Sequence, residues 1–406
     1  MKWAAAAAAV AVAVGIPGAA RGEGAATLPA GVWKADVRYL AVAGGPVRVR
    51  RSLVVPAELL GSLGLAPTGG APAEAEAEDL ELGELDLEVE FGAQVLAPGL
   101  SYGVTDWLSV GFVLPVFLDG AVVVRRFEYE GAWGYNPEFR GDRSRSLLLP
   151  AFDARAGGGA AGLQRALVEG FEYEPIDDVH ARGLGDLIVA ARARLWQTRH
   201  TVAALQPELL VPTGATDDPD NLIDFGLGDG HLDLGATFLL DVALTRSTIL
   251  GLEAGATHTF PHMTTARVYQ DPAFPIAARA PWPEPYAFIG YQRPVQRDPG
   301  EIVELGAAIT QTLHPAWSLT GRYGLLASAS DHFSDATSRL PALEQDTSRL
   351  VHTAGAALRF TLVDSFLRGH APLPLELSLD LARTFSTTPQ ANMTMVTATA
   401  TLFLGG

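Results

Sequence analysis

The stretch that decides the fold is LPLELSLDL at residues 373–381. Leucine occupies every second position, and Pro374, Glu376, Ser378 and Asp380 lie between the leucines. Successive side chains of a β-strand point to opposite faces, so this stretch predicts a strand with one apolar and one polar face. The alternation recurs in long segments along the chain, and about 9 to 11 residues suffice for a strand to cross a bilayer. Together with a secretory signal, the pattern predicts an all-β fold, a transmembrane antiparallel β-barrel.

Residues 1–20 have the features of an N-terminal signal peptide. Lys2 supplies positive charge, residues 4–14 form an apolar core, and residues 17–20 end in small side chains that suit signal peptidase. This core is shorter than the about 20 apolar residues that a membrane-spanning helix needs. Cleavage after Ala20 and cleavage after Ala26 both fit the pattern. No Cys follows, so a lipid anchor is not predicted, and an exported barrel belongs in the Gram-negative outer membrane.

Composition narrows the class of protein further. The 406 residues contain no Cys, so an exported chain cannot rely on disulfides. The net charge is −17, and the basic clusters are no longer than the pairs Arg50-Arg51 and Arg125-Arg126. Phosphate binding needs clustered Lys and Arg, which argues against a nucleic-acid partner. No cofactor is expected, and we predict a single barrel domain over residues 27–406.

The turns indicate the number and direction of the strands. Tight connections are expected at residues 105–107, 198–200, 243–246 and 314–315, and long ones at 43–84, 125–184, 213–230, 260–300 and 330–348. Short turns of such barrels lie in the periplasm and long loops lie outside the cell, which places both chain ends in the periplasm. The connections at 364–372 and 387–391 depart from this alternation in length. Twelve strands are predicted, near residues 31–42, 85–104, 107–124, 185–197, 200–212, 231–242, 246–259, 301–313, 316–329, 349–363, 373–386 and 392–404.

Four tryptophans support the orientation of the barrel. Trp33, Trp107, Trp196 and Trp317 all fall beside the predicted tight turns or the start of the first strand. Aromatic rings favour the membrane interface, where an apolar body and a polar N–H are both accommodated. They are therefore predicted to be interface aromatics, and the alternative is that they are core residues of a soluble sandwich.

The alternation also assigns the two faces of the wall. The lipid side is predicted to carry Leu85, Leu87, Val89, Phe91, Val95, Leu108, Val110, Phe112, Leu114, Leu187, Val189, Leu195, Leu232, Leu234, Phe238, Leu240, Leu305 and Ile309. The lumen is predicted to be lined by Asp36, Arg38, Asp86, Glu88, Glu90, Arg192, Arg194, Glu208, Asp233, Glu253, Glu304, Arg322, Arg359, Glu376 and Asp380. Charges of both signs inside a closed wall either pair and plug the lumen or solvate an open pore, and the residues favour neither reading.

Several short motifs resemble one family when taken in order. They are residues 27–31 (TLPAG), 102–107 (YGVTDW) with Leu114-Pro115, 183–187 (GLGDL), 211–214 (VPTG) and 228–230 (GDG). This series resembles the outer-membrane β-barrel family associated with the meta-pathway of phenol degradation, whose members are regarded as transporters. The resemblance implies a monomeric barrel that exports or admits hydrophobic or aromatic compounds. The insertion at about 125–182 departs from the family pattern. The terminal Gly405-Gly406 also departs from it, because the barrel assembly machinery is expected to recognise a final aromatic residue.

Other readings of individual residues remain open. Gly185 and Gly214 fit rim turns or ligand contacts, and the acidic residues between Asp217 and Asp229 fit turns or a calcium site, although not the spacing of an EF-hand. The loop 260–300 carries the aromatic residues Tyr269, Phe274, Trp282, Tyr286, Phe288 and Tyr291, which suit an entry site or a self-packed loop.

The functional prediction is an outer-membrane channel or transporter for small, hydrophobic or aromatic solutes. Its partners are then outer-membrane lipid, the solute and the assembly machinery. A structural or adhesive barrel is the alternative. An outer-membrane lipase is less favoured, because His258 and His352 have no recognisable serine nucleophile beside them. The closest histidines, His258 and His262, do not form a clustered ligand set, so no metal site and no catalytic residue are predicted.

Overall fold

The structure is a computed structural model, and it describes residues 24–55, 80–131, 159–165, 167–168, 173–224, 226–268, 291–335, 339–344, 347–386 and 392–405. The predicted signal peptide at residues 1–20, the aromatic residues from Tyr269 to Phe288 and the connection 387–391 lie outside the described residues.

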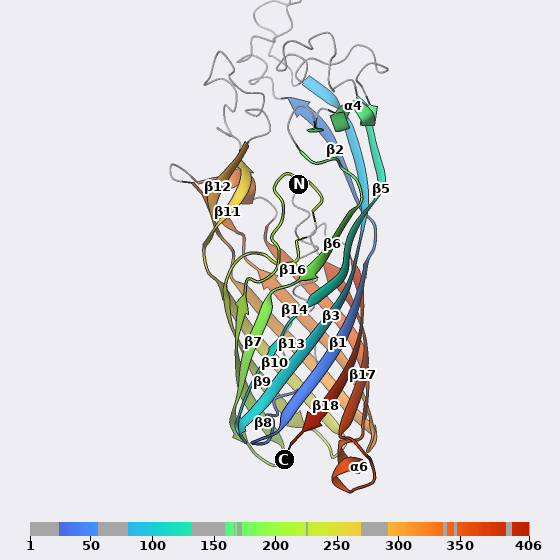
Figure 1. The fold of residues 1–406 in the computed structure, drawn as a ribbon, viewed down its shortest axis with the longest axis vertical. Helices are drawn as coiled ribbons and strands as arrows, with labels where there is room; N and C mark the ends of the chain where they lie inside the picture. The colour runs from blue at the N-terminus through green and yellow to red at the C-terminus, as the bar shows by residue number, and fades with distance from the viewer. Residues whose placement is uncertain are drawn as a thin grey trace, which may run out of the picture.

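The described strands form a closed antiparallel barrel with twelve strands in its wall, as the sequence predicts (Figure 1). Each wall strand pairs with the wall strands before and after it in the chain, including β3 with β1 and with β4, and β1 pairs with β18, which closes the wall. The wall consists of β1 (Trp33–Gly44), β3 (Leu80–Thr105), β4 (Leu108–Val113), β7 (Leu187–Gln197), β8 (Thr201–Val211), β9 (Asp233–Ala243), β10 (Thr248–Thr259), β13 (Ile302–His314), β14 (Trp317–Ser328), β16 (Arg349–Thr361), β17 (Leu375–Ser386) and β18 (Met393–Leu404).

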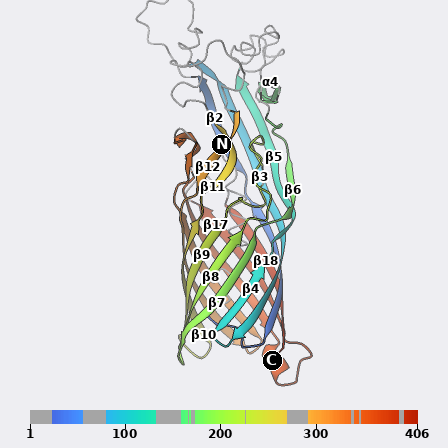
Figure 2. The same ribbon diagram turned by 60° about the vertical axis from the view of Figure 1, so that its left-hand side comes forward.

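One side of the wall continues far above the barrel. The upper part of β3 pairs there with β2 (Val47–Val55) and with β5 (Val116–Gly131), and β5 pairs with β6 (Val179–Leu184). Figures 1 and 2 show these strands as a tall extension, with the short helix α4 (Gly159–Arg165) near its top. We call these strands the extension. The predicted long loops at 43–84 and 125–184 thus contain strands, because their chain segments pair with each other above the barrel.

A small second sheet stands at the same end of the barrel, across from the extension (Figure 1). It contains β11 (His262–Val268), β12 (Tyr291–Asp298) and β15 (His332–Ser334), and the short helix α5 (Pro341–Glu344) follows it. At the opposite end, tight turns join the strands, and the connection between β16 and β17 contains helix α6 (Val363–Leu367). Among the described residues, no helix is both long and apolar enough to cross a membrane.

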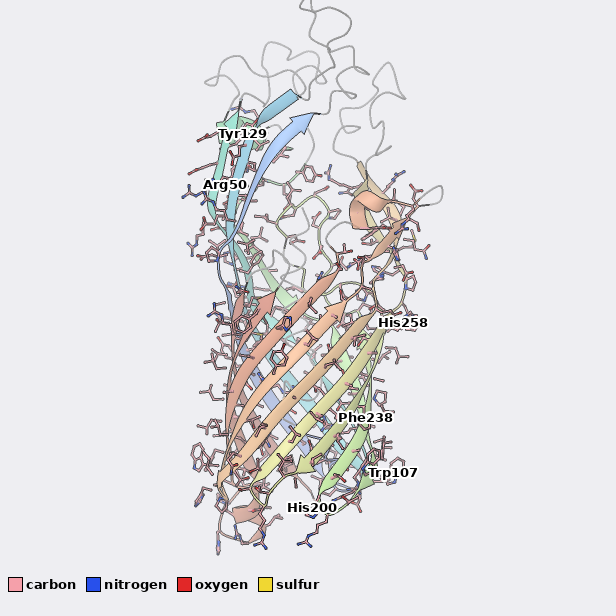
Figure 3. The ribbon with its side chains drawn as sticks, turned by 180° about the vertical axis from the view of Figure 1, so that it is seen from behind. Arg50, Trp107, Tyr129, His200, Phe238 and His258 are labelled. Carbon is pink, nitrogen blue, oxygen red and sulfur yellow. The ribbon has the colours of Figure 1, made fainter. Side chains whose placement is uncertain are left out.

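The outside of the lower barrel is apolar. Leu305, Ile309 and Leu379 are 49%, 54% and 56% exposed, and their neighbours along each strand point into the barrel. Apolar side chains exposed in this number on every strand would be costly in water and suit contact with lipid. Trp33, Trp107, Trp196 and Trp317 are also exposed, and they lie at the tight-turn end, where Figure 3 labels Trp107. Trp33 packs on Tyr102 and Trp317 on Phe360, at 4.6 and 4.8 Å between ring centroids.

The predicted faces of β3 are wrong. Leu85, Leu87, Val89, Phe91 and Val95 are buried, with at most 7% of each residue exposed, and pack in the main hydrophobic core. They point toward the inside because the upper part of β3 belongs to the extension, where water lies outside and apolar side chains turn away from it.

The acidic residues between them therefore lie on the outer face of the extension, and the prediction that they line the lumen is wrong. Asp86 pairs with Arg48, Glu90 with Arg125, and the Glu88 carboxylate lies 4.0 Å from Arg126. Arg50 shares this face with Asp86, and Figure 3 shows it pointing away from the barrel axis.

Candidate functional site: the lumen and its mouth

Charged side chains inside the lower barrel lie flat against the wall, across glycines of the neighbouring strand. Asp36 lies opposite Gly99, Glu253 opposite Gly306, and Arg322 opposite Gly355. A Cβ atom on Gly306 would lie 2.7 Å from the Glu253 Cγ, and one on Gly355 would lie 3.1 Å from the Arg322 Nε. These glycines therefore leave the room in which long charged side chains extend sideways along the wall.

This arrangement lets ion pairs form across the lumen wall. Arg322 on β14 crosses β16 above Gly355 and forms an ion pair with Asp380 on β17. The Arg359 Nε on β16 lies 3.5 Å from the Glu376 Oε1 on β17. Within β1, the Arg38 Nε lies 3.1 Å from the Asp36 Oδ2. The lower lumen is thus lined by paired charges of both signs.

An N-terminal segment, residues 24–31, occupies the inside of the barrel near the tight turns. The Arg192 Nη1 donates to the carbonyl oxygens of Gly24 and Ala26, at 3.0 and 3.3 Å. The backbone N–H of Ala25 donates to the Asp241 Oδ2 at 2.6 Å, and Ala25 is fully buried. Toward its end, the segment is held by a 2.8 Å hydrogen bond from the Gly31 N–H to the Gly103 carbonyl. Described residues of the chain therefore narrow the lumen from within.

At the opposite end, a mouth segment, residues 213–230, is tied to the wall by Asp186. The carboxylate of Asp186 accepts hydrogen bonds from the backbone N–H groups of Thr213, Gly214 and Asp229, at 2.9, 2.8 and 3.2 Å. A Cβ atom on Gly228 would lie 2.5 Å from this carboxylate, so only glycine leaves room for it. The three motifs GLGDL, VPTG and GDG meet here, and their glycines serve the close approach of backbone to carboxylate.

The mouth segment also completes an apolar core against one side of the wall. Ile223 and Leu227 of the segment pack with the inner face of the extension. The wall contributes buried side chains from β1, β3, β5, β17 and β18: Leu40, Val42, Leu85, Leu87, Val89, Phe91, Ala93, Val95, Ala97, Phe117, Val122, Tyr129, Ala382, Met393 and Met395. The interior therefore has an apolar side near the mouth and paired charges below it.

A second polar cluster lies where the mouth segment enters β9. His231 is only 6% exposed and lies between two carboxylates, with its Nε2 2.9 Å from the Asp229 Oδ2 and its Nδ1 2.8 Å from the Asp233 Oδ1. Burial lowers the pKa of His231, but hydrogen bonds to Asp229 and Asp233 outweigh burial and raise the pKa to about 9. The imidazole therefore carries two N–H groups at neutral pH and donates one to each carboxylate.

The sequence-predicted residues divide clearly between the two faces. By burial, pairing and position along each strand, the inner face carries Arg192, Arg194, Glu208, Asp233, Glu253, Glu304, Arg322, Arg359, Glu376 and Asp380. Only Asp86, Glu88 and Glu90 lie outside. The acidic residues of the mouth segment act in turns and ion pairs: the Asp218 carboxylate accepts the Asp220 N–H at 2.9 Å, and Asp220 pairs with Arg267.

Sequence reasoning missed Gln206, Asp241 and the N-terminal segment. Gln206 and Asp241 occupy inward positions of β8 and β9, and alternation could have found them. The histidines considered for catalysis have other contacts. His258, which Figure 3 labels, lies at the outer rim, with its Nδ1 2.6 Å from the Glu301 Oε1. The His352 Nδ1 lies 2.5 Å from the Tyr323 hydroxyl.

Comparison with known families now gives the family of the chain. Residues 111–331, from within β4 to the residue before β15, match the family model described as "Putative MetA-pathway of phenol degradation". The chain belongs to this family. The match covers the Asp186 motif, the mouth segment and Arg192, and it confirms the resemblance that the short motifs indicated.

Solved structures of outer-membrane proteins are similar to the chain at low sequence identity. An outer-membrane channel from Pseudomonas putida F1 shares 12% identity over 94% of this chain and 98% of its own, with a TM-score of 0.52. The Pseudomonas putida toluene transporter TodX shares 9% identity over 97% of this chain and 92% of its own, with a TM-score of 0.38. No curated protein matches the chain. The fold is that of Gram-negative outer-membrane channels.

Proposed function

We propose that this protein is an outer-membrane channel for small hydrophobic or aromatic molecules. The observation that carries the proposal is the apolar inner side of β1, β3 and β18, where Val42, Phe91 and Val95 face inward at the mouth and pack in one core with Ile223 and Leu227 of the mouth segment. A water-filled ion pore is lined by polar side chains, whereas apolar side chains with few polar groups suit a hydrophobic solute.

The contents of the lower lumen support selectivity against bulk ion flow. The N-terminal segment and the paired charges around Arg322 and Asp380 occupy space that an open pore would leave to water. Transport is then passive, with the tight turns in the periplasm and the mouth outside the cell. The protein acts as a monomer that the barrel assembly machinery inserts, and solute passage involves no catalysis.

The experiment is a permeability assay with the full-length protein folded into liposomes. The probes are phenol and a sugar of similar size, added outside vesicles at equal concentration. We expect the protein to increase phenol influx severalfold more than sugar influx. The double variant Val42→Thr and Val95→Thr keeps side-chain shape but adds inward hydroxyls, and should lower the effect on phenol. Val189→Thr is the control, because Val189 is exposed on the outer face.

The outcomes distinguish the candidate functions. Equal influx with and without protein would remove the channel proposal and leave a structural or adhesive barrel. Faster sugar than phenol influx would indicate a hydrophilic pore. Release of fatty acid from the vesicles would indicate a lipase.

A further inference from the structure

The polar cluster around His231 has the composition of a metal-binding site, and its residues come from separate elements. Asp229 and His231 belong to the end of the mouth segment and its junction with β9, Asp233 begins β9, and His262 begins β11. The ligand atoms of Asp229, His231 and Asp233 all lie within 4.8 Å of one another. The rings of His231 and His262 lie 5.2 Å apart, between centroids.

Two atoms of this cluster lack a partner. The Asp229 Oδ1 and the His262 Nδ1 are buried and form no hydrogen bond with any residue that the structure describes. A buried polar atom without a partner costs about 1–3 kcal/mol, so two of them around His231 need an explanation. A cation that accepts both lone pairs would satisfy both atoms at once.

The order of the groups matches a metal site with an orienting carboxylate. In such sites a histidine binds the metal through one ring nitrogen and donates its other N–H to a carboxylate. The Asp233 Oδ1 lies 2.8 Å from the His231 Nδ1, and Asp233 is only 6% exposed, so it is placed to hold the ring. The His231 Nε2 then faces the Asp229 carboxylate at 2.9 Å.

The spacing requires only a small adjustment. Zinc binds nitrogen at about 2.0–2.1 Å and carboxylate oxygen at about 2.0–2.2 Å, so two such ligands of a tetrahedral ion lie roughly 3.3 Å apart. The 2.9 Å separation of the His231 Nε2 and the Asp229 Oδ2 therefore has to open by a few tenths of an ångström, and an ion bound through both oxygens of the Asp229 carboxylate also satisfies Oδ1. Asp229 lies at the end of the mouth segment rather than inside a strand, which makes this movement possible.

Charge at the cluster also favours a cation. The carboxylates of Asp217, Asp229 and Asp331 lie in the electrostatic surroundings of Arg349 and Arg297, and the Asp233 carboxylate pairs with the protonated His231, so four carboxylates face three cations. The Arg297 Nη2 already pairs with Asp331 at 2.8 Å. A divalent ion, on displacing one proton from the His231 Nε2, adds one net positive charge to this acidic cluster.

We propose that Asp229, His231 and His262 bind one divalent transition-metal ion of the zinc type, with Asp233 as the positioning residue for His231. Imidazole and carboxylate ligands together suit zinc better than calcium or magnesium, which prefer oxygen ligands only. The ion would tie the mouth segment to the small sheet of β11, β12 and β15.

The experiment is zinc titration of the full-length folded barrel in detergent, by calorimetry and by dialysis with metal analysis. Zinc alone is the probe, and Co²⁺ is a second probe because tetrahedral nitrogen and oxygen ligation gives it a strong visible absorbance. We expect one zinc ion per chain. His262→Gln and Asp229→Asn should each weaken binding at least tenfold. Asp233→Asn should weaken it roughly 10- to 100-fold, as carboxylates that orient a ligand do.

His258→Gln is the matched control. It removes a histidine four positions from His262 that faces outward and pairs with Glu301, so zinc affinity should stay unchanged. Heat-dependent migration on gels confirms that each variant is folded. The proposal is overturned if folded wild-type protein binds no zinc, if His262→Gln binds as the wild type does, or if His258→Gln loses affinity equally.

Discussion

Arg192 on β7 donates a 3.0 Å hydrogen bond to the carbonyl oxygen of Gly24, a residue 168 positions earlier in the chain. Its Nε also donates to the Gln206 Oε1 at 2.7 Å. One guanidinium group thus joins the barrel wall to the N-terminal segment inside the lumen, and its planar set of donors is suited to such multiple contacts.

Removing this arginine should loosen the N-terminal segment. We expect Arg192→Ala to raise single-channel conductance in a planar bilayer severalfold, because the segment loses its contacts at Gly24 and Ala26. Arg194→Ala is the control, since Arg194 contacts Gln197 beside the tight turn instead. Equal conductance of both variants and the wild type would show that the segment does not limit the path.

Lysine substitutions should distinguish the two faces of β17. Leu377 is 42% exposed on the outer face, and Glu376 points inward toward Arg359. A lysine near the bilayer midplane costs about 2–4 kcal/mol, so Leu377→Lys should lower folding stability in lipid by up to this amount. Glu376→Lys should have no such penalty, because its side chain faces the lumen. Folding yields in vesicles at graded urea concentrations measure the difference, and equal yields would contradict the assignment of faces.

Ion selectivity should depend on inner acidic residues and not on those of the extension. Neutralising Asp86, Glu88 and Glu90 together should leave the reversal potential across a salt gradient unchanged, because these residues face outward. Glu253→Gln with Glu304→Gln should reduce any cation preference, since both occupy inner positions. The reverse result would place the outer carboxylates in the conduction path.

Asp186 should control the order of the mouth segment. Asp186→Ala leaves the N–H groups of Thr213, Gly214 and Asp229 without their acceptor. Each of these groups that water does not reach then destabilises the docked segment by about 1–3 kcal/mol. We expect faster proteolysis between residues 213 and 230, with the barrel still folded. Asp218→Ala is the control, because its carboxylate accepts an exposed turn hydrogen bond. Unchanged cleavage in Asp186→Ala would show that other contacts hold the segment.

The mouth segment should loosen as the pH rises through about 6. Burial, and then repulsion from Asp224, raises the pKa of Asp217 to about 6, above its ordinary value of 3.8. A group whose pKa is raised by folding contributes stability that is fully present below pH 3.8 and is lost as pH rises through the folded value. Hydrogen exchange of residues 213–230, corrected for its intrinsic pH dependence, should show less protection at pH 7.5 than at pH 5. Asp217→Asn should remove this difference, and a variant that keeps it would assign the effect to another group.

The alternation of residues 373–381 and the lengths of the turns determined much of this fold in advance. They gave the strand number, the antiparallel order and the outer face of strands such as β17, because a strand in a bilayer must be apolar on its lipid side. The inward charged positions of the lower barrel, including Arg322 and Asp380, followed from the same rule.

Tertiary structure alone decided which face of β3 points inward and which residues fill the lumen. A period of two separates two faces but does not say which one is inside, since apolar side chains point outward in lipid and inward in water. Leu87 and Glu88 exchanged their expected places because the extension leaves the barrel. Contacts such as Arg192 with Gly24, or His231 with His262, join residues far apart in sequence or in separate elements, and only closure of the barrel and docking of the mouth segment bring them together.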